Sequence, residues 1–567
     1  MVVPPIVNTA FRWLTLALAL WVLNFALTFH NVWPTLWIET RHELSIEIAV
    51  LVLGLALWGR LRRPPSAAVL TVLAAVLLVM TLGRYAEVTA PALYGRPVNL
   101  YWDAQHLPNV AAMLVRVAEP WLVAAGAVGL VALLVTVVAA LRLALARVVR
   151  GLGAPGERRA VVAIAGTLTA LFVLGHVHPQ LGTLRWFSLP VTGTYKQQMA
   201  FVTDALDEDR AAETLPPEVD LGDESLDALD GGDVVLAFLE SYGATSYDTP
   251  EIADALADVR ERLAESVRRS GRQAVSAFVE SPTFGGASWL AHASFMTGAR
   301  IGFGSPYDLL LTQHRDTLPR RFKRSGYRAV ALMPGLRQSW PEGAFYGFDA
   351  IHGAEALAYR GPEFGWWRIP DQYALAKVAD LELARTPRPP LLVFFPTIST
   401  HIPFRPTPPY QPDWRRLTSA EPYDPHEVEA SLAQGPEWLN LRPAYVDALR
   451  YAYEYWSGWL AARADARVVL VMLGDHQPPS SVSGEGVRWD VPVHVIASQP
   501  GILAALQSAG FTPGLAPEGD SIGPMHALTP LLLDAFAGTG AGSGSAYGAR
   551  AAAGADVSPE VSPAAPR

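Results

Sequence analysis

The chain has 567 residues, of which 51% are hydrophobic and 17% are charged, and its mean hydropathy is +0.21. This average is too apolar for a soluble enzyme and too polar for a pure transporter, so it predicts a membrane part joined to a soluble part. The net charge of −9 and the lack of a basic stripe with interleaved aromatics argue against nucleic acid as a partner. Because the chain has no cysteine, disulfides, thiolate metal sites and a cysteine nucleophile are excluded.

Five apolar stretches come first in the chain. A bilayer span needs roughly 20 mainly apolar residues, so the second and third stretches are short. The alternative for the first stretch is a cleaved signal peptide, but its basic end is weak (Arg12) and further apolar stretches follow, which favours an uncleaved span. The stretches are Phe11–Phe29, Leu44–Trp58, Ala67–Leu82, Trp121–Leu145 and Ala160–Leu174.

Arginines predict the orientation of these spans. By the positive-inside rule the arginine-rich loops are cytoplasmic, which places the N-terminus inside and, after five crossings, everything beyond Pro179 outside. If one short stretch does not span, the soluble part lies in the cytoplasm instead. The loops after the second and fourth stretches carry Arg60, Arg62, Arg63, Arg142, Arg147, Arg150, Arg158 and Arg159.

The composition divides the chain into four parts. We expect a transmembrane domain at 1–180 and a linker at 181–232 that becomes strongly acidic. A soluble domain should occupy 233–537. The tail at 538–567 consists largely of Gly, Ala, Ser and Pro without periodicity, and is predicted to be disordered.

Within the soluble domain, short apolar runs alternate with longer amphipathic segments. This alternation predicts an α/β domain with a parallel sheet covered on both faces. The expected strands are Val234–Leu239, Ala274–Val279, Ala329–Met333, Leu391–Thr397, Val468–Leu473 and Val491–Ala497, and the expected helices include Pro250–Ser270, Ser288–Met296 and Ala444–Ala464.

The stretch Gly285–Arg300 is the first candidate for chemistry. Two glycines precede Ser288, and a segment of helical character follows. Glycines allow a sharp turn and close approach of a ligand, and the start of a helix favours an anion. Ser288 is therefore well placed as a nucleophile toward a phosphate or sulfate ester. The alternative is that Ser288 is an ordinary helix N-cap.

Polar side chains follow three of the expected strands. Glu240 follows the first strand, Asp475 and His476 follow Val468–Leu473, and His401 follows Leu391–Thr397. Because sites in parallel sheets lie at the carboxyl ends of the strands, these side chains and Ser288 should converge. Each residue alone has an ordinary structural explanation. Together they predict a site for a divalent metal with N and O ligands, suited to Zn²⁺ or Mn²⁺.

These motifs resemble the sulfatase-like branch of the alkaline phosphatase superfamily, and most of all the membrane-anchored lipoteichoic acid synthases and the phosphoethanolamine and phosphoglycerol transferases. The resemblance covers about 233–537. It rests on a strand followed by Glu240-Ser241, on Ser288 followed by Thr297-Gly298, on Thr400-His401-Ile402-Pro403, and on Gly474-Asp475-His476.

The resemblance implies roles for these residues. Glu240, Ser288, Asp475 and His476 would hold one divalent ion (Mn²⁺ or Zn²⁺, with Mg²⁺ as a further option), Ser288 would be the nucleophile, and His401 would face the substrate. The Trp-x-Arg segment that reads glycerol phosphate in the synthases aligns with Trp340-Pro341-Glu342. Here Trp340 is a substrate-binding candidate, but the Arg is missing, which puts a glycerol-phosphate donor in doubt.

The function implied is transfer of a phospho-group, of phosphoglycerol or phosphoethanolamine type, from a lipid donor to an envelope glycan or lipid. The enzyme would sit in the cytoplasmic membrane with its catalytic domain on the periplasmic or extracellular side. Ser288 lacks the downstream Pro and Arg needed for oxidation to formylglycine, with His292 at the Arg position, which argues against sulfate-ester hydrolysis. The alternatives are a phosphodiesterase or sulfatase-type hydrolase and, in another class, a non-catalytic membrane scaffold.

Overall fold

The computed structural model describes residues 5–61, 64–117, 119–207, 215–302, 307–337, 340, 342–365, 369–435 and 437–538. Internal contacts divide the chain into two compact units, Met1–Leu206 and Asp207–Arg567. The segment expected to be a linker contains the helix α7 (Val191–Leu206). The tail expected from 538 onward lies, except for Gly538, outside the described residues.

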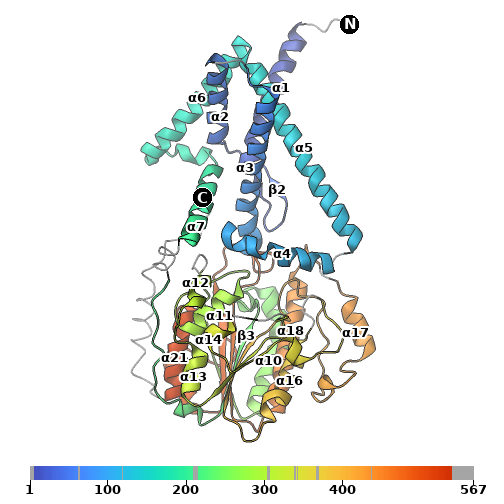
Figure 1. Ribbon diagram of the computed structural model, residues 1–567, viewed down its shortest axis with the longest axis vertical. Helices are drawn as coiled ribbons and strands as arrows, with labels where there is room; N and C mark the ends of the chain where they lie inside the picture. Colours follow the sequence, from blue (N-terminus) through green and yellow to red (C-terminus); the bar gives the residue numbers. More distant parts are fainter. Residues whose placement is uncertain are drawn as a thin grey trace. The chain divides into compact units, whose positions relative to one another are not determined.

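The first unit is a helical bundle, and each of the five predicted apolar stretches forms a helix in it (Figure 1). One apolar cluster contains side chains from all five. Four are long and apolar enough to cross a membrane, whereas α2, at 16 residues, is short for a 30 Å hydrocarbon layer. The helices are α1 (Pro5–Thr28), α2 (Ile46–Leu61), α3 (Ala67–Tyr94), α5 (Pro120–Leu152) and α6 (Pro155–Val177), with α4 (Leu100–Val117) between α3 and α5.

Contacts at the two ends of the bundle give the direction of its helices. At one end, Glu157 at the start of α6 binds both Arg12 near the start of α1 (2.7 Å) and Arg147 near the end of α5 (2.9 Å). At the other end, Leu44 before α2 forms a bridge with Phe187, which follows α6. The chain therefore enters the bundle at the Arg12 end and leaves α6 at the opposite end.

The second unit is built on an eight-stranded sheet, with the strand order β10-β4-β9-β8-β3-β7-β5-β6. Each predicted strand is present, with bounds within one or two residues of those expected. The strands are β3 (Asp233–Leu239), β4 (Gln273–Glu280), β5 (Arg328–Leu332), β6 (Ala350–His352), β7 (Leu391–Pro396), β8 (Val468–Gly474), β9 (Asp490–Ala497) and β10 (Thr512–Pro513). A separate hairpin, β1 (His30–Asn31) and β2 (Ile38–Glu39), belongs to the first unit.

The sheet is mixed, which corrects the expectation of a parallel sheet. Strands β8, β3, β7, β5 and β6 are parallel, but β9 is antiparallel to both β8 and β4. The physical reason lies in the connection from β8 to β9, which carries a single short helix, α19 (Ser480–Ser483). A connection without a crossover helix returns beside its own strand in the opposite direction.

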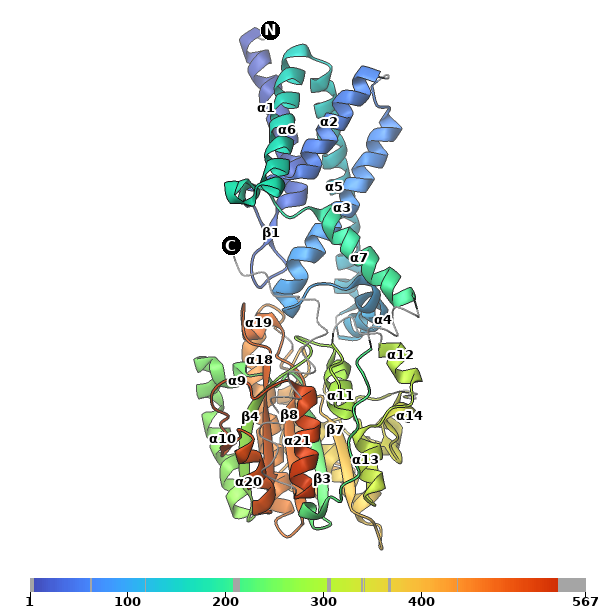
Figure 2. The same cartoon turned by 90° about the vertical axis from the view of Figure 1, so that its left-hand side faces the viewer.

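Helices cover both faces of the sheet, as the alternating pattern predicts. Figure 1 shows α11, α13 and α21 on one side of the strands and α10, α16 and α18 on the other, and Figure 2 shows the same layers turned by 90°. The helices are α9 (Thr245–Asp248), α10 (Pro250–Arg269), α11 (Ser288–Thr297), α12 (Tyr307–Thr312), α13 (Leu318–Arg324), α14 (Gly343–Tyr346), α15 (Ala354–Leu357), α16 (Asp371–Val378), α17 (Pro425–Leu432), α18 (Arg442–Ala462), α20 (Pro500–Ser508) and α21 (Met525–Ala537).

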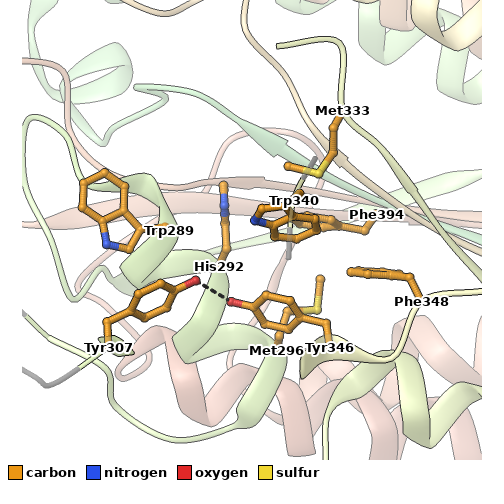
Figure 3. A pocket seen from close by; sticks show the side chains of 9 residues that line it. All are labelled: Trp289, His292, Met296, Tyr307, Met333, Trp340, Tyr346, Phe348 and Phe394. Atoms are coloured by element: carbon orange, nitrogen blue, oxygen red, sulfur yellow. Dashed lines mark hydrogen bonds between the residues drawn. The ribbon is translucent and has the colours of Figure 1, made fainter. Parts of the chain in front are cut away.

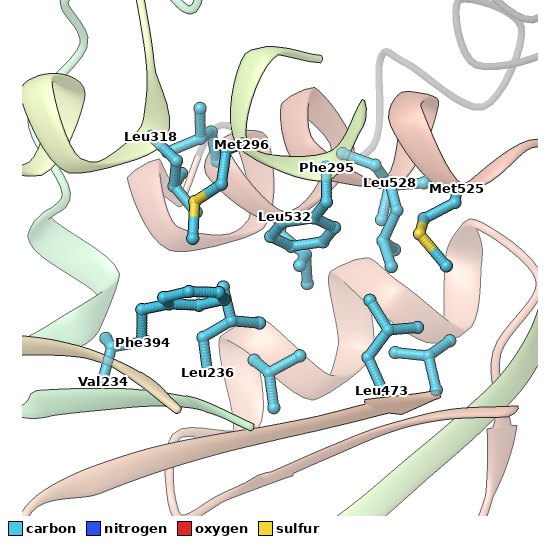
Figure 4. Close-up of a cluster of buried hydrophobic side chains, with 14 of the residues drawn as sticks. Val234, Leu236, Phe295, Met296, Leu318, Phe394, Leu473, Met525, Leu528 and Leu532 are labelled. Carbon is cyan, nitrogen blue, oxygen red and sulfur yellow. The ribbon is translucent and has the colours of Figure 1, made fainter. Parts of the chain in front are cut away.

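The side chains of β3 show why this strand is continuously apolar. Val234, Leu236 and Phe238 enter the core beneath α11 and α21, and Figure 4 shows part of this core with strand residues below and helix residues above. Val235 and Ala237 enter the second core beneath α10 and α18. A strand buried on both faces needs apolar residues at every position rather than at alternate ones.

Candidate active site

The loop before α11 presents Ser288 at the first position of the helix. Gly285 and Gly286 have positive φ (64° and 147°), which glycine permits at low cost, and Ala287 also has a positive φ (62°), which is unusual for a residue other than glycine. Ala287 is the N-cap residue, and no side chain caps the helix. The Ser288 hydroxyl instead points at acidic and imidazole groups from other elements, so the N-cap alternative does not describe this residue.

Ser288 meets side chains that follow two different strands. Its Oγ donates to Glu240 Oε2 at 2.9 Å and lies 3.2 Å from His476 Nε2. His476 Nε2 is in turn 3.3 Å from Glu240 Oε1 and 3.8 Å from Asp475 Oδ1. The structure thus brings together the four residues that the sequence suggested as metal ligands.

The strand register explains why Glu240 and Asp475 face one another. Leu239 at the end of β3 is paired with Gly474 at the end of β8, so the next residue of each strand emerges at the same edge. Gly474 allows this approach, because a Cβ at that position would lie 1.9 Å from the carbonyl oxygen of Tyr242. Any larger residue at 474 would push the two strand ends apart.

Backbone groups and neighbouring side chains hold the cluster in place. The Asp475 carboxylate accepts from the N–H of Ser241 (2.8 Å) and from that of His476 (2.7 Å). His476 Nδ1 lies 2.8 Å from the Gln477 carbonyl and must donate to it, which directs the Nε2 lone pair of the neutral ring toward Ser288 and Glu240.

Two of the supporting residues were not expected from the sequence. Ser241 has a φ of 57°, unusual for a residue other than glycine. The hydroxyl of Thr397, which directly follows β7, accepts from the Glu240 N–H at 3.2 Å. Their roles depend on backbone geometry, which no sequence pattern reports; the nearest signal is that each stands at or just after the end of an expected strand.

Burial makes this cluster electrostatically unusual. Burial opposes the charge of Glu240, but His401 and His476 outweigh it and lower the pKa of its carboxyl well below the usual range. Burial and the Glu240 carboxylate raise the pKa of Asp475 well above its ordinary value. Burial disfavours protonated His476, yet Asp475 and Glu240 raise its pKa to about 9. Protons thus compensate for two buried acids that face each other.

The donor set fits a divalent metal ion. One ligand atom from each of Glu240, Asp475 and His476 lies within 4.8 Å of the others, and these side chains are largely buried. Two carboxylates and one imidazole are ligands that Zn²⁺ and Mn²⁺ accept. An ion at this position would take the place of the protons and relieve the repulsion between the two acids.

The two substrate-binding candidates lie apart from the four clustered side chains. His401 follows β7 and is close enough to Glu240 for its charge to affect that carboxyl; its Nδ1 is 2.6 Å from the Ile402 carbonyl. Trp340 lies in the wall of a cavity of about 100 Å³, together with Trp289 (Figure 3). Trp366 and Trp367, two further tryptophans that follow Trp340 in the chain, are outside the described residues.

No protein-family model and no curated protein matches the chain. Among solved structures, it is similar to a protein in the alkaline phosphatase superfamily from Vibrio parahaemolyticus, with 16% identity, a TM-score of 0.36, and coverage of 57% of this chain and 69% of that one. It is also similar to the lipoteichoic acid synthase LtaP from Listeria monocytogenes, with 13% identity, a TM-score of 0.33, and coverage of 56% of this chain and 75% of that one. A third similar structure is the C-terminal periplasmic domain of EcEptC from Escherichia coli, with 15% identity, a TM-score of 0.33, and coverage of 56% of this chain and 84% of that one.

Proposed function

We propose that the protein is a membrane-anchored, metal-dependent enzyme that transfers a phospho-group from a lipid phosphodiester to a hydroxyl of an envelope glycan or lipid. One observation carries the proposal. The Ser288 hydroxyl, on the first turn of a helix, lies within 3.2 Å of both a buried carboxylate and a buried imidazole. A serine held in this way is a typical activated nucleophile.

Glu240, Asp475, His476 and Ser288 would hold the metal ion, Mn²⁺ or Zn²⁺ in the first instance and Mg²⁺ as a further option. When bound, such an ion lowers the pKa of a hydroxyl and neutralises charge on the transferred group. The protein contributes the rigid positions of the four side chains, since three of them follow strands of one sheet and the fourth begins a helix packed on it.

The chain's own groups perform two displacements. Ser288 Oγ, whose hydrogen bond Glu240 accepts, gives up its proton to solvent and attacks phosphorus. A phosphoserine forms and the bond to the leaving alcohol breaks. His401, in its imidazolium form, gives that alcohol a proton. The acceptor hydroxyl then attacks the phosphoserine and loses its proton to His401, the Oγ–P bond breaks, and the departing Ser288 Oγ takes a proton back from solvent.

The proposal places residues 207–567 outside the cytoplasmic membrane. The bundle supports this, because the chain enters at the end with Arg12 and Arg147 and leaves α6 at the opposite end. The absence of native cysteine makes the test simple. In spheroplasts, a membrane-impermeant maleimide should label a cysteine at the exposed Ser498 and leave one at Arg150 unlabelled. The reverse pattern would place the soluble unit in the cytoplasm.

Removal of the nucleophile tests the catalytic assignment. With a panel of labelled phospholipids and added Mn²⁺, Ser288→Ala should lose about 10³-fold or more in turnover while it binds Mn²⁺ within about tenfold of the original affinity. Ser508→Ala, an exposed serine on α20, is the matched control and should keep full activity. Undiminished turnover by Ser288→Ala would refute the assignment.

The products separate transfer from hydrolysis by the same site. A label found on a glycan or lipid acceptor indicates transfer, and a free phospho-headgroup indicates a phosphodiesterase. A purified protein that binds no divalent metal would favour the non-catalytic scaffold.

A further inference from the structure

The cavity beside the site has an unusual lining. Its volume is about 100 Å³, and none of the nine described side chains that form it is an acid, a lysine or an arginine. Six are aromatic, two are methionines, and one is His292 (Figure 3). The aromatic members are Trp289, Tyr307, Trp340, Tyr346, Phe348 and Phe394.

The cavity is connected to the nucleophile through α11. This helix begins at Ser288, and its next turns supply Trp289, His292 and Met296 to the cavity wall. Burial lowers the pKa of His292 to about 4, so the imidazole is neutral at neutral pH. The charges of Glu240 and His476 also affect this pKa, which places His292 close to the candidate active site. A group in the cavity would therefore be a near neighbour of a phosphorus atom at Ser288.

The lining excludes several ligand chemistries. An anion would find no positive charge there. A polyol such as glycerol would lose its hydrogen bonds with water, because the hydroxyls of Tyr307 and Tyr346 already bond each other at 3.2 Å. A primary ammonium needs several acceptors for its N–H groups. Among the cavity's described side chains, His292 Nε2 is a buried polar atom without a hydrogen-bond partner.

The remaining chemistry is a cation without N–H groups. Aromatic faces attract such a cation, and cages of Trp and Tyr are the usual way in which proteins bind quaternary ammonium groups. With Nδ1 protonated, His292 would present the Nε2 lone pair to the charge. An apolar cavity of about 150 Å³ holds benzene, so one of about 100 Å³ suits a group of about four heavy atoms, the size of trimethylammonium.

We propose that this aromatic cavity binds a quaternary ammonium group, and that the substrates of the enzyme include choline-type phosphodiesters. The inference rests on the proposed function, because Ser288 must react with the phosphorus next to that group. The choline stays on phosphorus during the first step: the Oγ–P bond forms, the bond from phosphorus to the leaving oxygen breaks, and the leaving group departs with the electron pair.

Three chromogenic esters test the proposal on the full-length protein in detergent with Mn²⁺. They are p-nitrophenyl phosphocholine, its neutral isostere p-nitrophenyl 3,3-dimethylbutyl phosphate, and p-nitrophenyl phosphoethanolamine. We expect kcat/KM for the choline ester to exceed that of each of the others by about tenfold or more. Equal values for choline and the isostere would show a merely apolar pocket, and a preference for ethanolamine would show hydrogen-bond recognition; either result overturns the proposal.

Variants of the cavity wall connect the preference to this place. Trp340→Leu and Phe348→Leu should each reduce the choline preference several-fold, whereas Trp438→Leu, an exposed tryptophan outside the cavity, should leave it unchanged. Two wall variants are used so that one poorly folded protein does not decide the result. A preference that survives in a folded wall variant would overturn the assignment.

Binding without chemistry separates this proposal from the proposed function. Tetramethylammonium should quench tryptophan fluorescence of Ser288→Ala and compete with the choline ester in the unaltered protein. If it binds but none of the three esters is cleaved, the cavity proposal stands and the proposed function fails. If esters are cleaved without discrimination and tetramethylammonium does not bind, the proposed function stands and the cavity proposal fails.

Discussion

The soluble unit contains two buried polar clusters, a tyrosine network around Tyr242 and the candidate metal cluster around Glu240. They differ in whether their charges are balanced. In the tyrosine network, the Tyr242 hydroxyl bonds Tyr453 (2.6 Å) and His494 Nε2 (2.9 Å), and His494 Nδ1 bonds Ser276 (2.6 Å). The charged member is Arg260, whose guanidinium lies over the Tyr247 ring at 4.1 Å. The tyrosine, histidine and serine groups are satisfied within the protein, as in a network that supports stability, and only Arg260 Nε among the groups named here has no hydrogen-bond partner.

The cluster of Glu240, Asp475 and His476 is different, because it contains two acids that repel each other and one imidazole. Without a cation, the cluster is stabilised by protons, because the pKa values of Asp475 and His476 are both raised. Burial alone would lower the pKa of the imidazole, so the rise comes from the neighbouring acids. A complete network points to a structural role, whereas an incomplete one points to a ligand. The comparison predicts that substitutions in the two clusters will have opposite effects on stability and function.

The largest effect should follow removal of an acid from the metal cluster. Asp475→Asn should abolish stoichiometric metal binding and reduce turnover about 10³-fold or more. Because the substitution removes a repulsive charge facing Glu240, the Tm of the metal-free protein should stay the same or rise at pH 8. Metal analysis and thermal unfolding measure the two effects. A large loss of metal-free stability would make the cluster structural.

The pH dependence of metal binding should be the next largest effect. His476 has a pKa of about 9 in the metal-free protein, so it is protonated at pH 7 and must lose that proton to bind a metal. Apparent affinity should therefore rise by up to about tenfold per pH unit from pH 7 to 9 and then level off. Calorimetry in buffers of different ionisation enthalpy would detect the released proton. A flat profile over this range would contradict the coupling.

The tyrosine network should respond to acid through stability. Burial and Arg260 lower the pKa of His494 to about 3, below the value of about 6.5 for an unfolded histidine. The stabilising contribution of the neutral ring is therefore complete above pH 6.5 and is lost as the pH falls through 3, by up to about 1.4 kcal/mol per pH unit. His494→Gln should show a shallower fall of Tm between pH 6.5 and 4. Parallel curves for the two proteins would contradict this account.

The smallest effect should come from one hydroxyl of the tyrosine network. Tyr453→Phe removes the partner of Tyr242 and should cost about 0.5–1.5 kcal/mol of unfolding free energy. Turnover and metal content should be unchanged, which distinguishes this variant from Asp475→Asn. A loss of metal from Tyr453→Phe would show that the two clusters are coupled.

Much of the fold was predictable from the sequence. Apolar runs such as Val234–Leu239 could be recognised because a strand buried on both faces has no polar positions, and the residues after three of the runs indicated the site. The antiparallel direction of β9 was not predictable, because an apolar run reads the same in either direction. The short strands β6 and β10 are too short for any periodic signal.

The candidate site was predictable in its acids, imidazole and serine, and less so in what surrounds them. Ser241 and Thr397 act through backbone geometry and a single hydroxyl. The cavity joins Tyr307, Trp340 and Phe394 from separate parts of the chain, and aromatic residues are so often found in cores that the sequence could not distinguish a wall from a core.

The most direct test of the central claim is a search for phosphoserine during turnover. The metal-loaded protein would be mixed with a reactive phosphodiester, quenched in acid within milliseconds, and digested for peptide mass spectrometry. We predict a phospho-adduct on Ser288, formed in less than one turnover and absent from Ser288→Ala. Turnover without any adduct on Ser288, or an adduct on another residue, would contradict the claim.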